Sequence, residues 1–226
     1  MDHGEKGKKK SEKTDATSFE RLIEIGIALS AEQDTDRLME TILLEAKRLS
    51  NADGGTLYLK TEDDTLKFEI MRTDSLKIAM GGTTGKEITF PPVSLYDPKT
   101  GDENKANVSS AAALTGKSIN ITDAYDSKDF DFTGTRKFDE GTGYRSKSFL
   151  TVPMKNFKGE IIDVLQLLNA QDRESGEVIS FGGDIQPLIE ALRSEGPDRR
   201  DIAFYVRNPH VLLASAPQEV FLDPSH

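Results

Sequence analysis

Two apolar segments in the second half of the chain constrain its fold more than any other feature. Residues 148–154 and 161–169 each have the length and composition of a buried strand, and only the short turn Asn156-Phe-Lys-Gly separates them. A second pair, residues 56–60 and 66–71, is joined by a turn at Glu62-Asp-Asp. Strands that follow one another through short turns pair antiparallel. The sequence therefore predicts an antiparallel sheet built from adjacent hairpins.

The segments around these strands predict helices that pack on the sheet. One helix begins at Asp34 or Thr35, either of which could cap it, and ends at Asn51-Ala-Asp-Gly-Gly. Its apolar residues recur with a helical period: Leu38, Met39, Ile42, Leu43, Ala46 and Leu49. The other expected elements are helices from Thr17, over 107–114 and over 183–192, a short strand over 118–121 and a polar loop over 123–146. The predicted fold class is therefore α+β.

The chain divides into one domain and two tails. Residues 1–16 are charged and poor in apolar side chains, which predicts a disordered tail. The domain spans residues 17–193, because Arg193-Ser-Glu-Gly-Pro breaks the closing helix. Residues 194–226 form an atypical C-terminal tail with apolar patches. This tail could form an added element, pack on a partner chain or be disordered.

Charge and residue usage exclude several functions. The 39 acidic residues outnumber the 29 basic ones, and the net charge of −10 disfavours binding to nucleic acid or to an anionic membrane surface. The absence of cysteine excludes disulfides, thiolate metal sites and cysteine nucleophiles. His3, His210 and His226 lie outside the domain core, which excludes haem ligation and histidine acid–base chemistry within it. We expect a cytoplasmic protein with no cofactor, no metal and no complete catalytic constellation.

Three blocks in the second half carry a recognisable pattern. They read TGKSINITDAY from Thr115, FDEGTGYRSKSFLTVPMKN from Phe138 and GEIIDVLQLLNAQD from Gly159. In combination they resemble the GAF domains of cyclic-nucleotide phosphodiesterases and adenylyl cyclases, and more closely those ahead of bacterial HD-GYP phosphodiesterase domains. The resemblance covers about residues 17–193. It implies a central antiparallel sheet with helices on one face, and a ligand pocket roofed by loops and a short helix on the other.

The resemblance also implies ligand contacts at six positions. They are Thr56 on the first strand, Val108 and Ser109 at the short helix, Asp139 and Ser146 beside the Gly143-Tyr-Arg-Ser motif, and Gln166 on the last strand. A helix N-terminus at Val108 suits an anionic phosphate, and Asp139 and Gln166 could read the edge of a purine base. From the residues alone, Gln166 is the polar member of an apolar row. It therefore either faces a ligand or bonds a neighbouring loop.

Some positions depart from the pattern of cyclic-nucleotide-binding members. Asn169 matches the family's asparagine, but Ala170 stands where a lysine is usual. Phe181 is present, and of the acidic pair that follows it only Asp184 remains. Asp163 occupies a position where glycine is usual. The lysine–aspartate pair that closes this motif in relatives cannot form here.

Two classes of function remain open. The first is a non-catalytic sensory domain that binds a cyclic nucleotide or another metabolite and signals through terminal helices to an effector protein. The second is a dimerisation scaffold whose pocket is empty or filled by its own side chains; a regulatory piece of a cyclic-nucleotide phosphodiesterase system is a further alternative. A homodimer is expected in either case, because the helix from Thr17 is apolar around most of its circumference.

Overall fold

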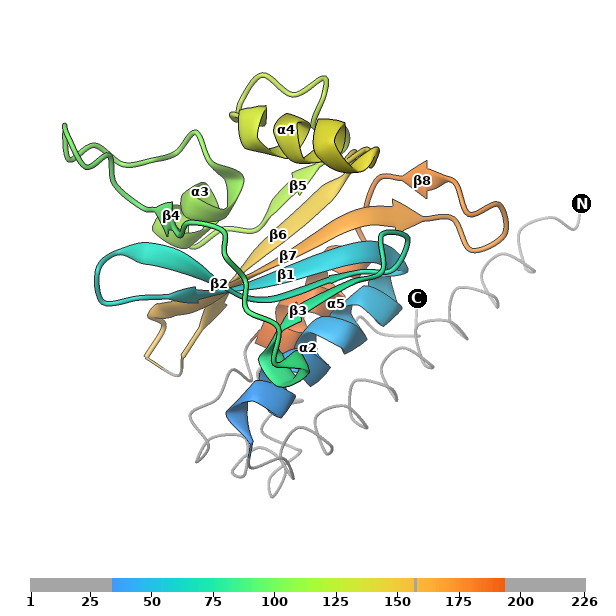
Figure 1. Cartoon of the computed structure of the whole chain (residues 1–226), viewed down its shortest axis with the longest axis horizontal. Helices are drawn as coiled ribbons and strands as arrows, with labels where there is room; N and C mark the ends of the chain where they lie inside the picture. The colour runs from blue at the N-terminus through green and yellow to red at the C-terminus, as the bar shows by residue number, and fades with distance from the viewer. Residues whose placement is uncertain (1–33, 157, 194–226) are drawn as a thin grey trace, which may run out of the picture.

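The computed structural model describes residues 34–156 and 158–193, and within these ranges eight strands form one sheet (Figure 1). All strand pairs are antiparallel, in the order β3-β2-β1-β7-β6-β5, with β4 paired to β2 and β8 to β7. The strands are β1 (Ala52–Lys60), β2 (Thr65–Thr73), β3 (Ile78–Gly81), β4 (Val93–Ser94), β5 (Ile119–Ile121), β6 (Phe149–Lys155), β7 (Ile161–Gln171) and β8 (Val178–Ile179). The antiparallel α+β fold predicted from the hairpins is confirmed.

Helices α2 (Thr35–Ser50) and α5 (Ile185–Arg193) cover one face of the sheet (Figure 1). The carboxylate of Asp34 caps α2 by accepting the N–H of Asp36 at 2.9 Å, which is one of the two caps that the sequence predicts. Five of the six apolar residues in the predicted stripe are buried, and Leu49 is half-buried. With Ile189 of α5 and the strand residues beneath, they form the main hydrophobic core.

The close approach of α2 to the sheet depends on a glycine in β1. A Cβ at Gly55 would lie 2.7 Å from Cδ1 of Leu43 and 3.2 Å from Cγ of Lys47, so a larger residue would displace the helix. The helix ends at Ser50, and Asn51 alone, with φ 50° and ψ 40°, joins it to β1. This joint fixes where β1 begins relative to the helix.

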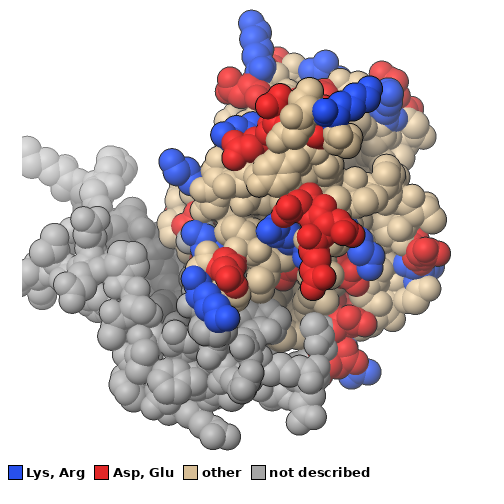
Figure 2. Space-filling view, turned by 90° about the vertical axis from the view of Figure 1, so that its left-hand side faces the viewer, with Lys and Arg blue, Asp and Glu red and all other residues tan. Residues whose placement is uncertain are grey.

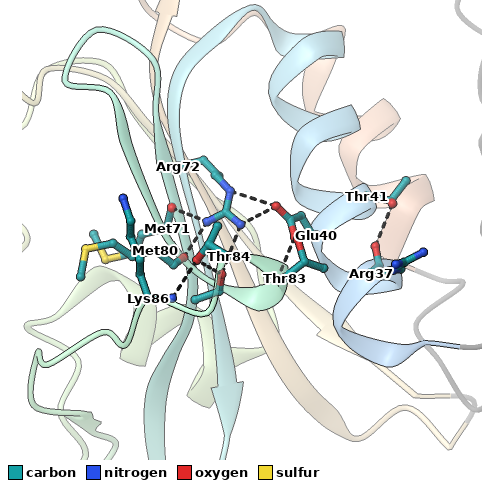
Figure 3. Close-up of polar contacts among 10 residues, drawn as sticks. Arg37, Glu40, Thr41, Met71, Arg72, Met80, Thr83, Thr84 and Lys86 are labelled. Atoms are coloured by element: carbon teal, nitrogen blue, oxygen red, sulfur yellow. Dashed lines mark hydrogen bonds and ion pairs between the residues drawn. The ribbon is translucent and has the colours of Figure 1, made fainter.

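A buried ion pair holds the β3 edge of the sheet to α2 (Figure 3). Arg72 of β2 donates from Nε to Oε1 of Glu40 at 3.1 Å. Its Nη1 donates to the carbonyls of Met71 at 2.7 Å and Met80 at 2.6 Å. Thr83, in the 3₁₀ turn η1 (Gly82–Thr84), donates its N–H to Oε2 of Glu40 at 3.0 Å. Burial raises the pKa of Glu40, but the hydrogen bonds from Thr83 and Arg72 and the charge of Arg72 outweigh it and hold that pKa below its ordinary value.

The opposite face of the sheet lies beneath α3 (Val108–Thr115), α4 (Thr133–Thr142) and the long connections between them (Figure 1). Two smaller apolar clusters fill this layer. The first contains Tyr58, Leu66, Leu95, Ala113 and Val164. The second contains Val108, Ile121, Ala124, Phe132 and Phe149. The layers therefore follow the expected order, with α2 and α5 on one face and α3, α4 and the long connections on the other.

β1, β3 and α4 differ from their predictions, and the two-residue strands β4 and β8 were not predicted. β1 begins at Ala52 and not at Thr56, because the residues predicted to end the helix pair with β7. β3 forms in a stretch where the sequence indicated no element, and it pairs with β2. α4 forms within the predicted polar loop, although Gly134 and Gly141 lower its local helix propensity, because side-chain bonds of Asp139 hold it in place.

Several predictions concern residues outside the described ranges. They are the tail over 1–16, the helix from Thr17 and the tail over 194–226. Among the described helices, none combines the length and apolarity needed to cross a bilayer.

Candidate functional site

A row of polar side chains crosses the centre of the sheet on the face beneath α3. Thr56 of β1 and Thr151 of β6 both lie opposite Gln166 of β7. Nε2 of Gln166 donates to Oγ1 of Thr151 at 3.0 Å and to Oγ of Ser109 at 3.2 Å. Its Oε1 accepts from the hydroxyl of Tyr58 at 3.2 Å. The structure therefore brings three of the predicted contacts, Thr56, Ser109 and Gln166, to one place, with Thr56 and Gln166 half-buried.

The side chains of this polar row are uncharged. Burial raises the pKa of Tyr58 to about 12, against the smaller opposing effect of its hydrogen bond with Ser109. Tyr58 is therefore a neutral hydrogen-bond donor at physiological pH. Hydroxyl and amide groups that donate and accept suit the edge of a neutral heterocycle, whereas they supply no base or activated nucleophile.

The first turn of α3 stands directly above this row. The side chain of Asn107 caps the helix by accepting the N–H of Ser110 at 3.1 Å. The side chain of Val108 is buried in the cluster with Phe132 and Phe149, so only its backbone can contact a ligand. Ser109 is buried, and its hydroxyl faces Gln166.

Asp139 and Ser146, the remaining two predicted contacts, lie together but bond each other. Oδ1 of Asp139 accepts the Ser146 hydroxyl at 2.7 Å, and Oδ2 accepts the Ser146 N–H at 2.8 Å. Oδ2 also accepts the hydroxyl of Tyr125 at 2.7 Å. These bonds fasten α4 to the residues that follow it. Both residues are buried, so contact of either side chain with a ligand remains a prediction.

The Gly143-Tyr-Arg-Ser motif turns the chain from α4 into β6. Gly143 is the C-cap of α4 and has φ 71°, a left-handed conformation that glycine adopts readily. The guanidinium of Arg145 lies 4.2 Å from the ring centroid of Tyr125, within the range of a cation–π contact. Asn169 of β7 holds this motif: its Oδ1 accepts the N–H of Lys147 at 2.7 Å, and its Nδ2 donates to the carbonyl of Arg145 at 2.8 Å. The family's asparagine therefore has a structural partner here.

The surface adds two observations about the described residues. Figure 2 shows acidic and basic side chains interspersed on one face, with uncharged surface between them. A hollow of about 450 Å³ lies within the connection from Ser94 to Ala106, away from the polar row. Across the described ranges, no three His, Asp or Glu side chains are grouped to hold a metal ion.

Comparison with known sequences gives one family and a set of relatives. A family model described as GAF domain matches residues 34–184. The cGMP-specific 3',5'-cyclic phosphodiesterase of Drosophila sechellia is 29% identical over 161 residues, which are 69% of this chain and 12% of that protein. The protein of the same name from Drosophila melanogaster is also 29% identical over 161 residues, or 13% of its length. The chain therefore spans about an eighth of the length of these relatives.

Solved structures match over nearly their whole length. The GAF domain of an Acinetobacter phosphoenolpyruvate-protein phosphotransferase aligns with a TM-score of 0.55 and 11% identity, covering 88% of this chain and 98% of that one. The corresponding domain from Coxiella burnetii aligns with a TM-score of 0.55 and 12% identity, covering 87% and 96%. At these identities the likeness concerns the fold alone.

Proposed function

This chain belongs to the GAF domain family, and we propose that it is a non-catalytic sensory domain that binds a small molecule against the polar row under α3. The observation that carries the proposal is Gln166, a half-buried amide in the middle of the sheet, surrounded by hydroxyls of Tyr58, Ser109 and Thr151. A buried apolar layer gains nothing from such a polar centre. A ligand with a polar ring edge would use it.

The first candidate ligand is cGMP. Relatives that are 29% identical are cGMP-specific phosphodiesterases by name. Hydroxyl and amide groups match the mixed donors and acceptors of a purine edge, and the N-terminus of α3 favours a phosphate. The missing lysine at Ala170 counts against a site identical to that of other members, so cAMP and free nucleobases belong in the same screen.

The output would pass to a phosphodiesterase or to another effector. We propose that the chain acts in the cytoplasm as a homodimer and regulates a cyclic-nucleotide phosphodiesterase or an HD-GYP phosphodiesterase. Light scattering at micromolar concentration tests the dimer, since a monomer would contradict it.

Thermal shift and isothermal titration with cGMP, cAMP and guanine test ligand binding. A ligand at 100 times its Kd adds about 2.7 kcal/mol to stability, which raises the Tm of a domain this size by about 5–10 °C. Gln166→Leu should weaken binding about tenfold, the value of one hydrogen bond. Gln186→Leu on α5 makes the same chemical change on the opposite face and should leave affinity unchanged. If no compound in the screen shifts the Tm, the sensory proposal fails.

A ligand-free scaffold is the second candidate, and one observation favours it. Gln166 already has partners for both its nitrogen and its oxygen, and Asp139 and Ser146 satisfy each other. A scaffold needs no open polar site. In that case Gln166→Leu should be neutral or stabilising, and the dimer should form without any added compound.

A further inference from the structure

A chain of hydrogen bonds links the segment after α4 to the sheet near the end of α2. We call residues 133–148 the roof segment. The hydroxyl of Tyr144 in this segment donates to Oδ2 of Asp53 at 2.6 Å. Asp53 is the second residue of β1 and lies three positions after the last residue of α2. A single hydroxyl therefore joins two elements that are 91 residues apart in the sequence.

Asp53 also bonds the turn between β2 and β3. Its Oδ2 accepts the hydroxyl of Ser75 at 2.7 Å, and its Oδ1 accepts the N–H of Ser75 at 3.1 Å. The backbone carbonyl of Asp53 accepts the N–H of Asp74 at 3.0 Å. Asp53 is only 5% exposed, so a hydrogen bond lost from its carboxylate is poorly replaced by water.

The 74–77 turn also contacts the last part of α2. Oδ1 of Asp74 lies 2.6 Å from Nζ of Lys47, whose side chain is 5% exposed and packs over Gly55. Because the Lys47 side chain is buried and bonded to Asp74, the position of Asp74 bears on the position of the helix. The bonds thus run from Tyr144 through Asp53 and the 74–77 turn to α2.

A second contact path ends at the same place. Asn169 holds the backbone of Arg145 and Lys147 in the roof segment. Two residues later, Gln171 exchanges two bonds with Asn51: its N–H donates to the Asn51 carbonyl at 2.9 Å, and its own carbonyl accepts from Nδ2 at 2.7 Å. Asn51 is the C-cap of α2. Both paths therefore connect the roof segment to the C-terminal end of one helix.

We propose that Tyr144 is a latch that couples closure of the roof segment to the last turn of α2. When the roof segment opens, the bond to Asp53 breaks, the 74–77 turn loosens and Lys47 loses its fixed partner. This inference rests on the proposed function for its use, because a ligand that contacts both the polar row and the roof segment would favour the closed latch. The mechanical link itself is a property of the free chain.

Amide hydrogen exchange on the full chain without ligand tests the latch. Tyr144→Phe keeps the ring and removes the hydroxyl. Exchange should rise about tenfold or more at residues 74–77 and 47–51 as well as in the roof segment. Tyr125→Phe is the matched control, because that hydroxyl bonds Asp139 within the roof layer. It leaves the bond between Tyr144 and Asp53 in place, so exchange should rise in the connection over 123–132 and not at 74–77 or 47–51. Unchanged exchange at 74–77 and 47–51 in Tyr144→Phe, or an equal rise there in Tyr125→Phe, overturns the proposal.

A second variant approaches the same link from the exposed side. Asp74→Asn removes the charge of the ion pair with buried Lys47 but keeps a carbonyl oxygen that can accept from its ammonium, and circular dichroism checks that the fold is retained. Because coupling is reciprocal, exchange should rise at 47–51 and also in the roof segment. Asp64→Asn, in the exposed turn between β1 and β2, should change neither region. A rise confined to 47–51 in Asp74→Asn overturns the coupling. Failure of cGMP, cAMP and guanine to bind would instead refute the proposed function and leave these exchange results standing.

Discussion

The buried carboxyl group of Asp163 predicts that the stability of the folded chain falls as the pH rises. Asp163 lies on β7 opposite Leu59 and Met154, is 4% exposed, and its Oδ1 has no hydrogen-bond partner among the described residues. Burial, with a smaller contribution from the charge of Glu69, raises its pKa from the ordinary 3.8 to about 7. The folded chain therefore keeps a proton that the unfolded chain has lost between these two values.

The sign and size of the effect follow from this difference. The folded state binds more protons than the unfolded state between pH 3.8 and about 7, so stability falls as pH rises through that window and is level above it. A pKa change of this size corresponds to about 4 kcal/mol in total. Between pH 5 and pH 8 the expected loss is about 2.5 kcal/mol. Asp163→Asn cannot ionise and should not show this loss.

Urea unfolding followed by far-UV circular dichroism provides the assay, because the chain has no tryptophan. The free energy of unfolding of the unmodified chain should fall by about 2.5 kcal/mol relative to Asp163→Asn between pH 5 and pH 8. Asp172→Asn is the control. Hydrogen bonds from the N–H and hydroxyl of Ser175 and from the N–H of Glu174 hold the pKa of Asp172 below its ordinary value, so its contribution is already complete at pH 5. A difference between the chain and Asp163→Asn that stays constant from pH 5 to pH 8 would refute the reasoning.

Three further substitutions probe the packing that positions the site, each measured by urea unfolding. Glu40→Gln should lower the free energy of unfolding by about 3 kcal/mol, because it leaves the buried guanidinium of Arg72 without its counter-charge. The control Lys67→Gln, in an exposed ion pair, should lower it by less than about 1 kcal/mol. Equal losses in the two variants would contradict this. Gly81→Ala should lower the free energy of unfolding by about 3 kcal/mol, because its Cβ would lie 1.9 Å from a backbone oxygen. Gly85→Ala, with a similar φ and no atom within 4 Å of its Cβ, should lower it by about 1 kcal/mol. Leu43→Ala should cost about 3 kcal/mol, and a cost below about 1 kcal/mol would show that the α2 core is loosely packed.

The main layers of the fold follow from local sequence patterns, whereas α4 and β3, which the sequence did not predict, do not. The apolar strand segments and the apolar stripe of α2 can be predicted from the sequence, because each buries a whole face and so carries a regular apolar pattern. α4 has two glycines, and its key residue Asp139 is fixed by Tyr125, which lies 14 residues away. β3 has four half-buried residues, and the carbonyls of Met80 and Gly81 accept bonds from Arg72 across the sheet edge. Contacts of this kind depend on tertiary geometry, which no local pattern records.

Of the candidate site, only one residue could be predicted from the residue pattern alone. Gln166 is conspicuous in the sequence because it interrupts an apolar row. Its partners Thr151 and Tyr58 were missed, because they are set by the register of β7 against β6 and β1. Asn169 was recognised only through the family pattern, and its role in holding the Gly143 turn depends on its left-handed backbone, with φ 54°.

The joint between α2 and β1 has a mechanical consequence. Asn51 is the only residue between the helix and the central strand, so the two share one covalent joint with no slack. Axial sliding of α2 would have to drag β1 through its ladders with both neighbouring strands, which would break many hydrogen bonds at once. Tilting about Asn51 breaks none of those ladders. Any displacement of α2 should therefore be a tilt about Asn51, largest at the N-terminal end of the helix and opposed there by the bonds of Glu40 to Arg72 and Thr83.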